Sequence, residues 1–473
     1  MRGFPKARNI GVGASAAQRT TTPLQLLTGV VLFGGAATSA LIWPPAGMAM
    51  LVLVQVGFLI ITFWRLLTVL VSQRPGPPPP PAPDIWPRYS VVVALHDEAA
   101  ILPYLVERLS RLDYPASLLD GYLVLETHDH VTIAAAQAMK RPDWLHVLVV
   151  PPGAPTTKPR ALNHALATAK GDFLTVYDAE DDPDPLQLKE AAARFAAEPD
   201  DLVCLQAPLR IRRLHRGYED SPFLDRHFAA EYAALFEITL PAMARLGLPF
   251  PLGGTSNHFR GAALRALGGW DAWKVTAAAV LGFRIWRHGW RLGVLTRPTY
   301  ETPPGRLLHW LPQRTRWLKG YMQTLLVHTR SATGMGWRGW SALFLTLGAA
   351  LASAALHALS VAWITTFLLL ALLSRQLPVT PWIGLGILSI GTAAAAFTTL
   401  IGARRANTPF HIQDVLAAPA YWSLLSLAFI HALIRLAVEP HRWDKTAHKP
   451  DVALQDFPPL PAAGIAESGR AAA

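Results

Sequence analysis

Cysteine is almost absent from this chain of 473 residues, which contains Cys204 alone. A single cysteine cannot form an intramolecular disulfide, and it cannot build the thiolate clusters that hold structural zinc or iron–sulfur centres. Any metal site in the chain must therefore use other ligands.

Acidic residues are absent from the first 22 residues, which carry Arg2, Lys6, Arg8 and Arg19. The whole chain has a net charge of +11. Nucleic-acid binding would account for such a charge, but Lys and Arg also gather beside membrane spans on the cytoplasmic face. The chain has long apolar segments, so we expect a membrane and no nucleic acid. Residues 1–23 are predicted to be a cytosolic basic N-terminus.

Charged residues are also absent from two neighbouring runs, 24–43 and 48–64, which two prolines separate. About 20 apolar residues cross the hydrocarbon of a bilayer, so residues 24–74 are predicted to be a transmembrane helical hairpin. A signal peptide fits less well, because the first run is too long and the second follows at once. Residues 75–84 are rich in proline and are predicted to be a stiff linker.

From residue 85 onward, apolar runs rich in β-branched residues alternate with segments of helical spacing. The predicted strands are 89–95, 122–125, 146–150 and 173–177, and the predicted helices are 99–112, 132–139 and 158–169. Such alternation indicates βαβ units and a parallel sheet, with ligand loops beyond the carboxyl ends of the strands. Residues 85–335 are therefore predicted to be one α/β domain.

Apolar segments return at 342–374, 382–401 and 415–433. The first could form one tilted span or two short ones, so residues 341–437 are predicted to hold three or four transmembrane helices. Arg404 and Arg405 favour a cytoplasmic loop, and the basic residues after position 434 favour a cytoplasmic tail. Three simple spans cannot satisfy both. Residues 438–473 are predicted to be a tail, partly disordered.

Five carboxylates directly follow the predicted strand 173–177, in the segment Asp178-Ala179-Glu180-Asp181-Asp182-Pro183-Asp184. Carboxylates this close repel one another unless a cation lies among them, and hard oxygen ligands suit Mg²⁺ or Mn²⁺ together with a diphosphate. Asp and Pro also cap and start helices. A solvated helix start is therefore an equally good interpretation of this segment alone.

A basic and aromatic segment, Gln313-Arg314-Thr315-Arg316-Trp317, lies shortly before the C-terminal apolar region. A juxtamembrane belt would explain the Arg and Trp residues but not the Gln. Arg side chains could equally hold a diphosphate leaving group, and Trp offers a face on which a sugar ring can stack. Proximity to the membrane suits both interpretations.

Four further motifs occur with these two segments. They are Ala94-Leu95-His96-Asp97-Glu98-Ala99, Lys158-Pro159-Arg160-Ala161-Leu162-Asn163, Gly253-Gly254-Thr255-Ser256-Asn257-His258-Phe259-Arg260 and Gly268-Gly269-Trp270-Asp271. In this order, the six motifs between residues 89 and 323 resemble the membrane-bound family 2 glycosyltransferases, the group that includes cellulose and hyaluronan synthases. Each motif alone is weak, but six in the family's order are specific.

The resemblance implies an α/β fold of the GT-A type, a mixed sheet with a Rossmann-like nucleotide-binding half, flanked by transmembrane α-helices. It implies that Asp178 and Glu180, in the place of the family's DxD motif, hold Mg²⁺ or Mn²⁺ at the diphosphate of a UDP- or GDP-sugar. The implied donor-binding residues are Glu98, Asp129, Lys158, Asn163 and Asp178. The implied acceptor- and diphosphate-binding residues are Gln313, Arg314, Arg316 and Trp317.

The chain departs from the family where the catalytic base is expected. Relatives carry Thr-Glu-Asp after the Gly-Trp-Asp turn, and this Asp takes the proton of the acceptor hydroxyl, whereas here the segment reads Thr276-Ala277-Ala278. Losing a general base costs about 10² to 10⁴ in rate. Asp271 is the candidate substitute base, although it could equally cap the following helix. Glu301 is another candidate, and a shifted alignment or an inactivated transferase are the remaining explanations.

The sequence thus predicts an inverting, membrane-bound glycosyltransferase that transfers a sugar to a lipid, polysaccharide or protein acceptor, with impaired turnover. The alternative is a catalytically inactive, nucleotide-sugar-binding component of a polysaccharide-assembly complex. A transporter with a regulatory domain is a weaker third hypothesis, because the spans carry few polar groups. We expect a multi-pass protein of the bacterial inner (plasma) membrane, with the catalytic-type domain in the cytosol and with polysaccharide export proteins as candidate partners.

Overall fold

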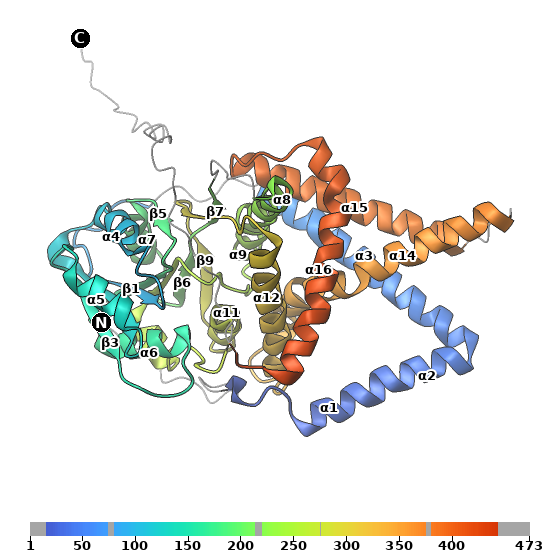
Figure 1. Ribbon diagram of the computed structural model, residues 1–473, viewed down its shortest axis with the longest axis horizontal. Helices are drawn as coiled ribbons and strands as arrows, with labels where there is room; N and C mark the ends of the chain where they lie inside the picture. Colours follow the sequence, from blue (N-terminus) through green and yellow to red (C-terminus); the bar gives the residue numbers. More distant parts are fainter. Residues whose placement is uncertain (1–15, 74–79, 213–219, 275, 375–379, 443–473) are drawn as a thin grey trace, which may run out of the picture.

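The computed structural model describes residues 16–73, 80–212, 220–274, 276–374 and 380–442. Most of the basic N-terminus, most of the predicted Pro-rich linker and the tail beyond residue 442 lie outside the described residues. The described chain has two parts, a region built on β-sheets and a set of long helices that project from it (Figure 1).

A seven-stranded mixed sheet, ordered β3-β2-β1-β4-β8-β6-β9, forms the centre of the first part. Its strands are β1 (Tyr89–Leu95), β2 (Leu119–Glu126), β3 (Leu145–Val150), β4 (Phe173–Tyr177), β6 (Leu202–Gln206), β8 (Asn257–Arg260) and β9 (Arg291–Val294). Strands β1 to β4 are parallel, whereas β8 is antiparallel to both of its neighbours. The α/β fold with a mixed sheet and a parallel nucleotide-binding-type half is therefore confirmed.

A small second sheet lies beside the end of β4. It joins β5 (Asp182–Pro183), β10 (Thr299–Glu301) and β7 (Leu209–Ile211) in the order β5-β10-β7. Because β5 belongs to the acidic segment after β4, this pairing brings β10, and with it Glu301, to the same loop.

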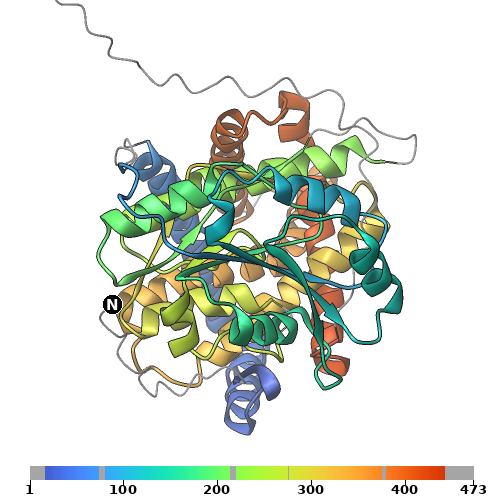
Figure 2. The same ribbon diagram turned by 90° about the vertical axis from the view of Figure 1, so that its left-hand side faces the viewer.

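Helices cover both faces of the large sheet (Figure 2). Val91 and Val93 of β1 pack in one hydrophobic cluster with α4 (Leu102–Ser110) and α7 (Gln187–Ala197), while Val92 packs in another with α6 (Lys158–Thr168). Successive strand residues point to opposite faces, so a continuous apolar run is what a strand buried on both faces requires.

The remaining helices of this part follow the same chain order. They are η3 (Ala116–Leu118), α5 (His130–Ala138), α8 (Pro222–Ala233), the π-helical η4 (Ala234–Thr239), α9 (Leu240–Arg245), α10 (Gly261–Ala266), α11 (Ala277–Arg287) and α12 (Leu307–His328). Helix α8, η4 and α9 form one continuous rod whose middle is wound one residue wider than an α-helix.

The apolar part consists of an N-terminal and a C-terminal group. The N-terminal group contains η1 (Ala16–Gln18), α1 (Pro23–Gly29), the π-helical η2 (Val30–Gly34), α2 (Gly35–Ile42) and α3 (Pro44–Ser72). The C-terminal group contains α13 (Gly336–Leu343), the π-helical η5 (Phe344–Gly348), α14 (Ala349–Ser374), α15 (Thr380–Arg405) and α16 (Ile412–Val438).

Five stretches of the described helices are long and apolar enough to cross a membrane. They are Pro23–Ile42, Pro44–Ser72, Gly336–Leu373, Trp382–Arg405 and Ile412–Val438. The first C-terminal apolar run is one continuous helical stretch of 38 residues. It is thus a single long segment rather than two short ones.

Helix α15 packs closely on the sheet-containing part. A Cβ at Gly402 would lie 2.8 Å from the carbonyl oxygen of Ala233, at the point where α8 becomes η4. Only glycine permits this approach, so the apolar helices are docked directly onto the rod of α8 and η4.

Candidate active site

One cavity of about 940 Å³ connects the carboxyl ends of the strands to the apolar helices. On the polar side it is lined by the ends of β1 and β4, the start of α6 and the start of α11. On the apolar side it is lined by α3, α14, α15 and α16. Carboxyl ends of parallel strands are where α/β proteins bind ligands, so this cavity is the candidate site.

Asp178, the first acid after β4, pairs with Lys158 at the start of α6. The same ammonium group donates a second hydrogen bond to the carbonyl of Gly254 at 3.1 Å. Asp178, Glu180, Lys158 and Gly254 all line the cavity. The structure thus brings three of the predicted donor- and metal-binding residues together, and a lysine that is already held beside an acid is well placed to receive a phosphate.

Asp181 supports this loop from below. Its carboxylate is completely buried and accepts hydrogen bonds from the backbone N–H of Asp178, at 2.8 Å, and from the Thr255 hydroxyl. Burial raises the pKa of Asp181 well above its usual value, and the charges of Asp178 and Glu180 raise it further. Asp181 therefore positions the loop rather than offering a free ligand oxygen.

The remaining two acids of the segment are used in ion pairs. Asp182 binds Arg111 at 2.6 Å and also pairs with Arg212, and Asp184 binds Arg297 at 3.1 Å. The five-carboxylate run therefore divides into a pair that faces the cavity, Asp178 and Glu180, and three acids that hold the loop to its neighbours.

Glu301 adds another carboxylate to the cavity from the end of β10. Burial raises the pKa of Glu301 well above its usual value, followed in effect by the charges of Asp181, Glu180 and Asp178. Several carboxylates that raise one another's pKa in this way form a local excess of negative charge. The residues present therefore fit a divalent cation, since a cation would relieve that repulsion.

Glu98 and Asp129 lie where β1 and β2 end. Glu98 is buried and lines the cavity. Asp129 does not line it; its two carboxylate oxygens accept hydrogen bonds from the N–H of Asp97, at 2.6 Å, and of Thr132, at 3.1 Å. Burial alone would raise the pKa of Asp129, but these hydrogen bonds and the neighbouring His96 hold it below its usual value.

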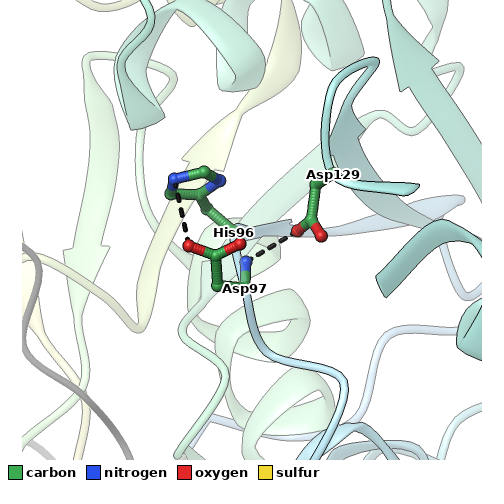
Figure 3. Close-up of side chains that lie close together, drawn as sticks. All are labelled: His96, Asp97 and Asp129. Atoms are coloured by element: carbon green, nitrogen blue, oxygen red, sulfur yellow. Dashed lines mark hydrogen bonds and ion pairs between the residues drawn. The ribbon is translucent and has the colours of Figure 1, made fainter. Parts of the chain in front are cut away.

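His96, Asp97 and Asp129 form the one group of three potential ligand side chains found among the described residues, with their ligand atoms within 4.8 Å of one another (Figure 3). His96 Nε2 lies 3.5 Å from the Asp97 carboxylate, and Asp129 serves as the N-cap of α5. These internal bonds account for the group as a brace between the first two strand ends. The predicted metal ligands, Asp178 and Glu180, lie outside it.

Asn163, predicted to bind the donor, lies one turn further along α6, outside the cavity lining. Its side-chain amide donates to the Trp270 carbonyl and accepts from the Trp270 N–H, both at 2.8 Å. Gly269 has a φ of +70°, and a Cβ there would lie 2.2 Å from the Asn163 side-chain oxygen. The contacts of Asn163 therefore fix the Gly-Gly-Trp turn, and its donor-binding role stays a prediction.

All four predicted residues of the basic and aromatic segment, Gln313, Arg314, Arg316 and Trp317, line the cavity from α12. The Arg314 side chain is only 5% exposed and binds Glu231 of α8 at 2.6 Å. It also donates to the Tyr421 hydroxyl at 2.9 Å and lies over the ring of Trp317, 4.6 Å from its centre. Although burial alone would lower the pKa of Arg314, the charge of Glu231 raises it, so this arginine remains charged.

Gln313 has a different environment. Its side-chain oxygen is buried and has no hydrogen-bond partner among the described residues. A buried acceptor without a partner costs about 1–3 kcal/mol, which a ligand donor would recover. The segment is thus divided between Arg314, which holds elements together, and Gln313, which has an open acceptor.

The position of the expected base lies on the cavity. Thr276, Ala277 and Ala278 line it at the first turn of α11, where no carboxylate is present. Asp271, the predicted substitute, is 1% exposed, does not line the cavity and accepts the N–H of Trp273 at 3.1 Å. Of the two acids considered from the sequence, Glu301 therefore reaches the cavity and Asp271 does not.

Two cavity residues escaped the sequence analysis. Glu231 is the partner of Arg314, and its side chain remains 43% exposed. Arg65 of α3 lines the cavity beside it, and its guanidinium makes no hydrogen bond or ion pair with the described residues. Arg65 is the only charged residue in its apolar run, and this isolation was the signal that could have revealed it.

Comparison with known proteins agrees with this geometry. A family model described as glycosyl transferase family group 2 matches residues 173–390, which include β4, the acidic loop and α12. The sequence identifies the chain as a family 2 glycosyltransferase. Among curated family 2 relatives, the beta-monoglucosyldiacylglycerol synthase of Synechocystis sp. is 29% identical over 54% of this chain and 52% of that synthase. The cellulose synthase 1 catalytic subunit (UDP-forming) of Komagataeibacter xylinus is 25% identical over 55% of this chain and 34% of that subunit.

The chain spans about half or less of the length of these two relatives. Among solved structures, the mannosyltransferase PcManGT from Pyrobaculum calidifontis, determined in complex with GDP-Man and Mn²⁺, is similar with a TM-score of 0.53. That likeness covers 82% of this family 2 chain and 99% of PcManGT at 17% identity. It supports the GT-A-type fold.

Proposed function

We propose that this chain is a membrane-bound glycosyltransferase that binds a nucleotide sugar at the carboxyl ends of β1 and β4. The observation that carries the proposal is the single cavity shared by Lys158, Asp178 and the α12 segment. Its polar end suits a diphosphate, and its apolar walls suit an acceptor at the membrane. The match to the synthase of Synechocystis supports a lipid acceptor, and the match to cellulose synthases supports a polysaccharide.

In the proposed transfer, an acceptor oxygen attacks the anomeric carbon of the donor sugar from the face opposite the diphosphate. A new carbon–oxygen bond forms as the bond to the diphosphate breaks, and the nucleoside diphosphate leaves with the bonding electrons. Lys158 and Arg316 are the cationic side chains that we assign to the leaving group. Mg²⁺ or Mn²⁺, bound at Asp178 and Glu180, would neutralise charge on the leaving diphosphate.

The proton of the acceptor hydroxyl must go to a base within hydrogen-bond reach. We assign it to Glu301, because this carboxylate lines the cavity and its raised pKa favours accepting a proton. Changing Glu301 to Gln should reduce release of nucleoside diphosphate by about 10²-fold or more while donor binding persists.

One observation favours a second candidate function. Ala277 and Ala278 replace the expected acids on the cavity wall, so the donor side is complete and the acceptor side lacks its usual base. A component that binds a nucleotide sugar without turning it over, within a polysaccharide-assembly complex, has this combination. We place either form in the bacterial inner membrane with the site facing the cytosol.

The two functions are separated by one assay on the purified full-length chain with Mn²⁺ and a panel of UDP- and GDP-sugars. Calorimetry measures binding, and detection of free nucleoside diphosphate measures turnover. Binding with release supports the transferase, binding without release supports the second candidate, and no binding refutes both. Lys158→Gln should weaken binding, whereas Lys189→Gln, which breaks a more exposed ion pair with Asp113, is the matched control that should not.

A further inference from the structure

Helix α16 is bound to the sheet-containing part at its beginning. The Asp414 carboxylate pairs with Arg226 of α8 at 2.8 Å, and the Asp414 carbonyl lies 2.9 Å from Nε2 of His227. Asp414 itself is 2% exposed. The first turn of α16 is therefore held by α8, which follows directly from the small second sheet.

Contacts continue along the middle of the helix. The Tyr421 hydroxyl donates to Glu231 at 3.0 Å and accepts from Arg314, and His431 Nδ1 lies 3.0 Å from the hydroxyl of Thr315. The partners come from α8 and from the polar helix α12. Helices α12 and α16 lie side by side (Figure 1).

The end of α16 is held by the same polar helix. Lys319 is completely buried, and its ammonium group donates to the carbonyl of Glu439 at 3.2 Å. Gln323 donates to the carbonyl of Pro440 at 2.9 Å, and His441 Nδ1 lies 3.0 Å from the carbonyl of Trp273. Both ends of α16 therefore contact the sheet-containing part.

A helix of 27 residues is about 40 Å long, enough to cross the hydrocarbon of a bilayer, which is about 30 Å thick. If α16 crossed, its two ends would lie on opposite sides of the membrane. The polar residues that hold them, from Arg226 to Lys319, would then have to lie on both sides as well. Its length and composition allow a span, but its contacts do not.

The other four apolar helices show the opposite arrangement, because each has only one end on the sheet-containing part. Arg330 donates to the carbonyl of Thr20 before α1, and Arg245 to the carbonyl of Ser72 at the end of α3. Arg338 of α13 donates to Gly247, and Arg405 at the end of α15 donates to Glu237. The opposite ends of these helices project away from the sheets (Figure 1).

The face of α16 that turns away from the protein is apolar. Its exposed residues are Ile412, Leu416, Leu427, Ile430, Leu433, Ile434 and Val438. Its opposite face carries Asp414, Tyr421 and His431, which bind the polar part. One apolar and one polar face along the same helix are typical of a helix that lies in a membrane surface.

We infer that α16 does not cross the membrane but lies in its surface, with the apolar face in contact with lipid. The chain then has four spans, two before and two after the sheet-containing part. Arg404 and Arg405, which precede α16, and Arg435 and Arg442, at its far end, all lie on one side. The conflict between the basic loop and the basic tail disappears, in agreement with the distribution of cations beside spans. This inference is independent of the sugar transfer.

Cysteine labelling tests the arrangement in sealed vesicles of known orientation with a membrane-impermeant maleimide. Cys204 is completely buried, so the unmodified chain is expected to give no labelling. Four exposed positions are then changed singly to Cys: Glu107 near the sheets, Trp43 at the opposite end of the N-terminal spans, Arg404 before α16 and Arg442 after it.

We expect Glu107→Cys, Arg404→Cys and Arg442→Cys to label from one side and Trp43→Cys from the other. Labelling of Arg442→Cys together with Trp43→Cys would show that α16 crosses and would overturn the inference. An epitope tag after Ala473 gives the same readout without a substitution in the fold: its exposure on the side of Glu107 supports the inference, and exposure on the side of Trp43 refutes it.

Discussion

Restoring an acid at Ala278 should raise turnover. Ala278 is the second residue of α11 and lines the cavity, at the position where the family resemblance implies the base. An acidic residue in the first turn of a helix is stabilised by about 0.3–1 kcal/mol, so Ala278→Asp should not weaken α11. The substitution therefore changes the chemistry of the cavity wall with little cost to the fold.

The size of the effect follows from what a general base contributes. A correctly positioned base accelerates proton transfer by about 10² to 10⁴, which is about 2.7–5.4 kcal/mol of barrier. Ala278→Asp should increase nucleoside diphosphate release in that range wherever Glu301 is a weaker substitute. Donor binding should stay unchanged, because Lys158 and Asp178 are untouched.

The assay measures release of free nucleoside diphosphate and transfer of radiolabelled sugar, with donor affinity determined in parallel. Ala278→Asn is the matched control, since its side chain has the size of Asp but cannot accept the proton. Equal rates for the Asp and Asn variants, both with full donor binding, would refute the role assigned to this position.

Three further changes test the framework of the site. Glu231→Gln removes the charge paired with the nearly buried Arg314 and should lower the free energy of unfolding by about 1–3 kcal/mol, seen as a lower melting temperature in detergent. Gly320→Ala would place a Cβ 1.9 Å from the Thr276 hydroxyl oxygen and should cost about 1–3 kcal/mol by overpacking, in the same melting assay. His258 has its pKa lowered to about 3 by burial, so the unfolded chain binds one more proton between about pH 6.5 and pH 3. Stability should fall as the pH drops through that window, and His258→Gln should flatten the profile by up to about 1.4 kcal/mol per pH unit.

Controls for these changes come from positions without such contacts. Glu107→Gln removes an exposed acid and should leave the melting temperature unchanged, and Gly57→Ala meets no atom within 4 Å. Stable Glu231→Gln or Gly320→Ala proteins would contradict the contacts described here. A profile of His258→Gln as steep as that of the unmodified chain would show that other groups govern acid sensitivity.

The parallel half of the sheet could be predicted from the sequence because its strands are buried on both faces. Their apolar runs are therefore continuous, and two predicted strands, Tyr89–Leu95 and Phe173–Tyr177, coincide with β1 and β4. The antiparallel insertion of β8 could not be predicted, because strand order depends on long-range pairing that local periodicity does not encode. The family resemblance supplied the mixed sheet instead.

The acidic loop illustrates the same limit at the site. Asp178 and Asp184 are alike in sequence, yet Asp178 faces the cavity and Asp184 binds Arg297, more than a hundred residues away. Glu231 was missed because it lies in an ordinary helical pattern and acquires its role only through Arg314. Local motifs thus predicted the strand-end ligands, whereas partners supplied by distant elements required the structure.

The wide turn η4 gives the rod of α8 and α9 a helical phase that an uninterrupted α-helix would not have. One residue occupies about 100° of an α-helical turn, so deleting a single residue within Ala234–Thr239 would rotate α9 by that angle relative to Glu231. Glu231 and Gly402 contacts lie on one side of this bulge, and the contact of Arg245 with α3 lies on the other. A one-residue deletion would therefore uncouple the alignment of the cavity from that of the spans without shortening any apolar segment. The length of this single turn is a register through which the family could shift its membrane part against its active site.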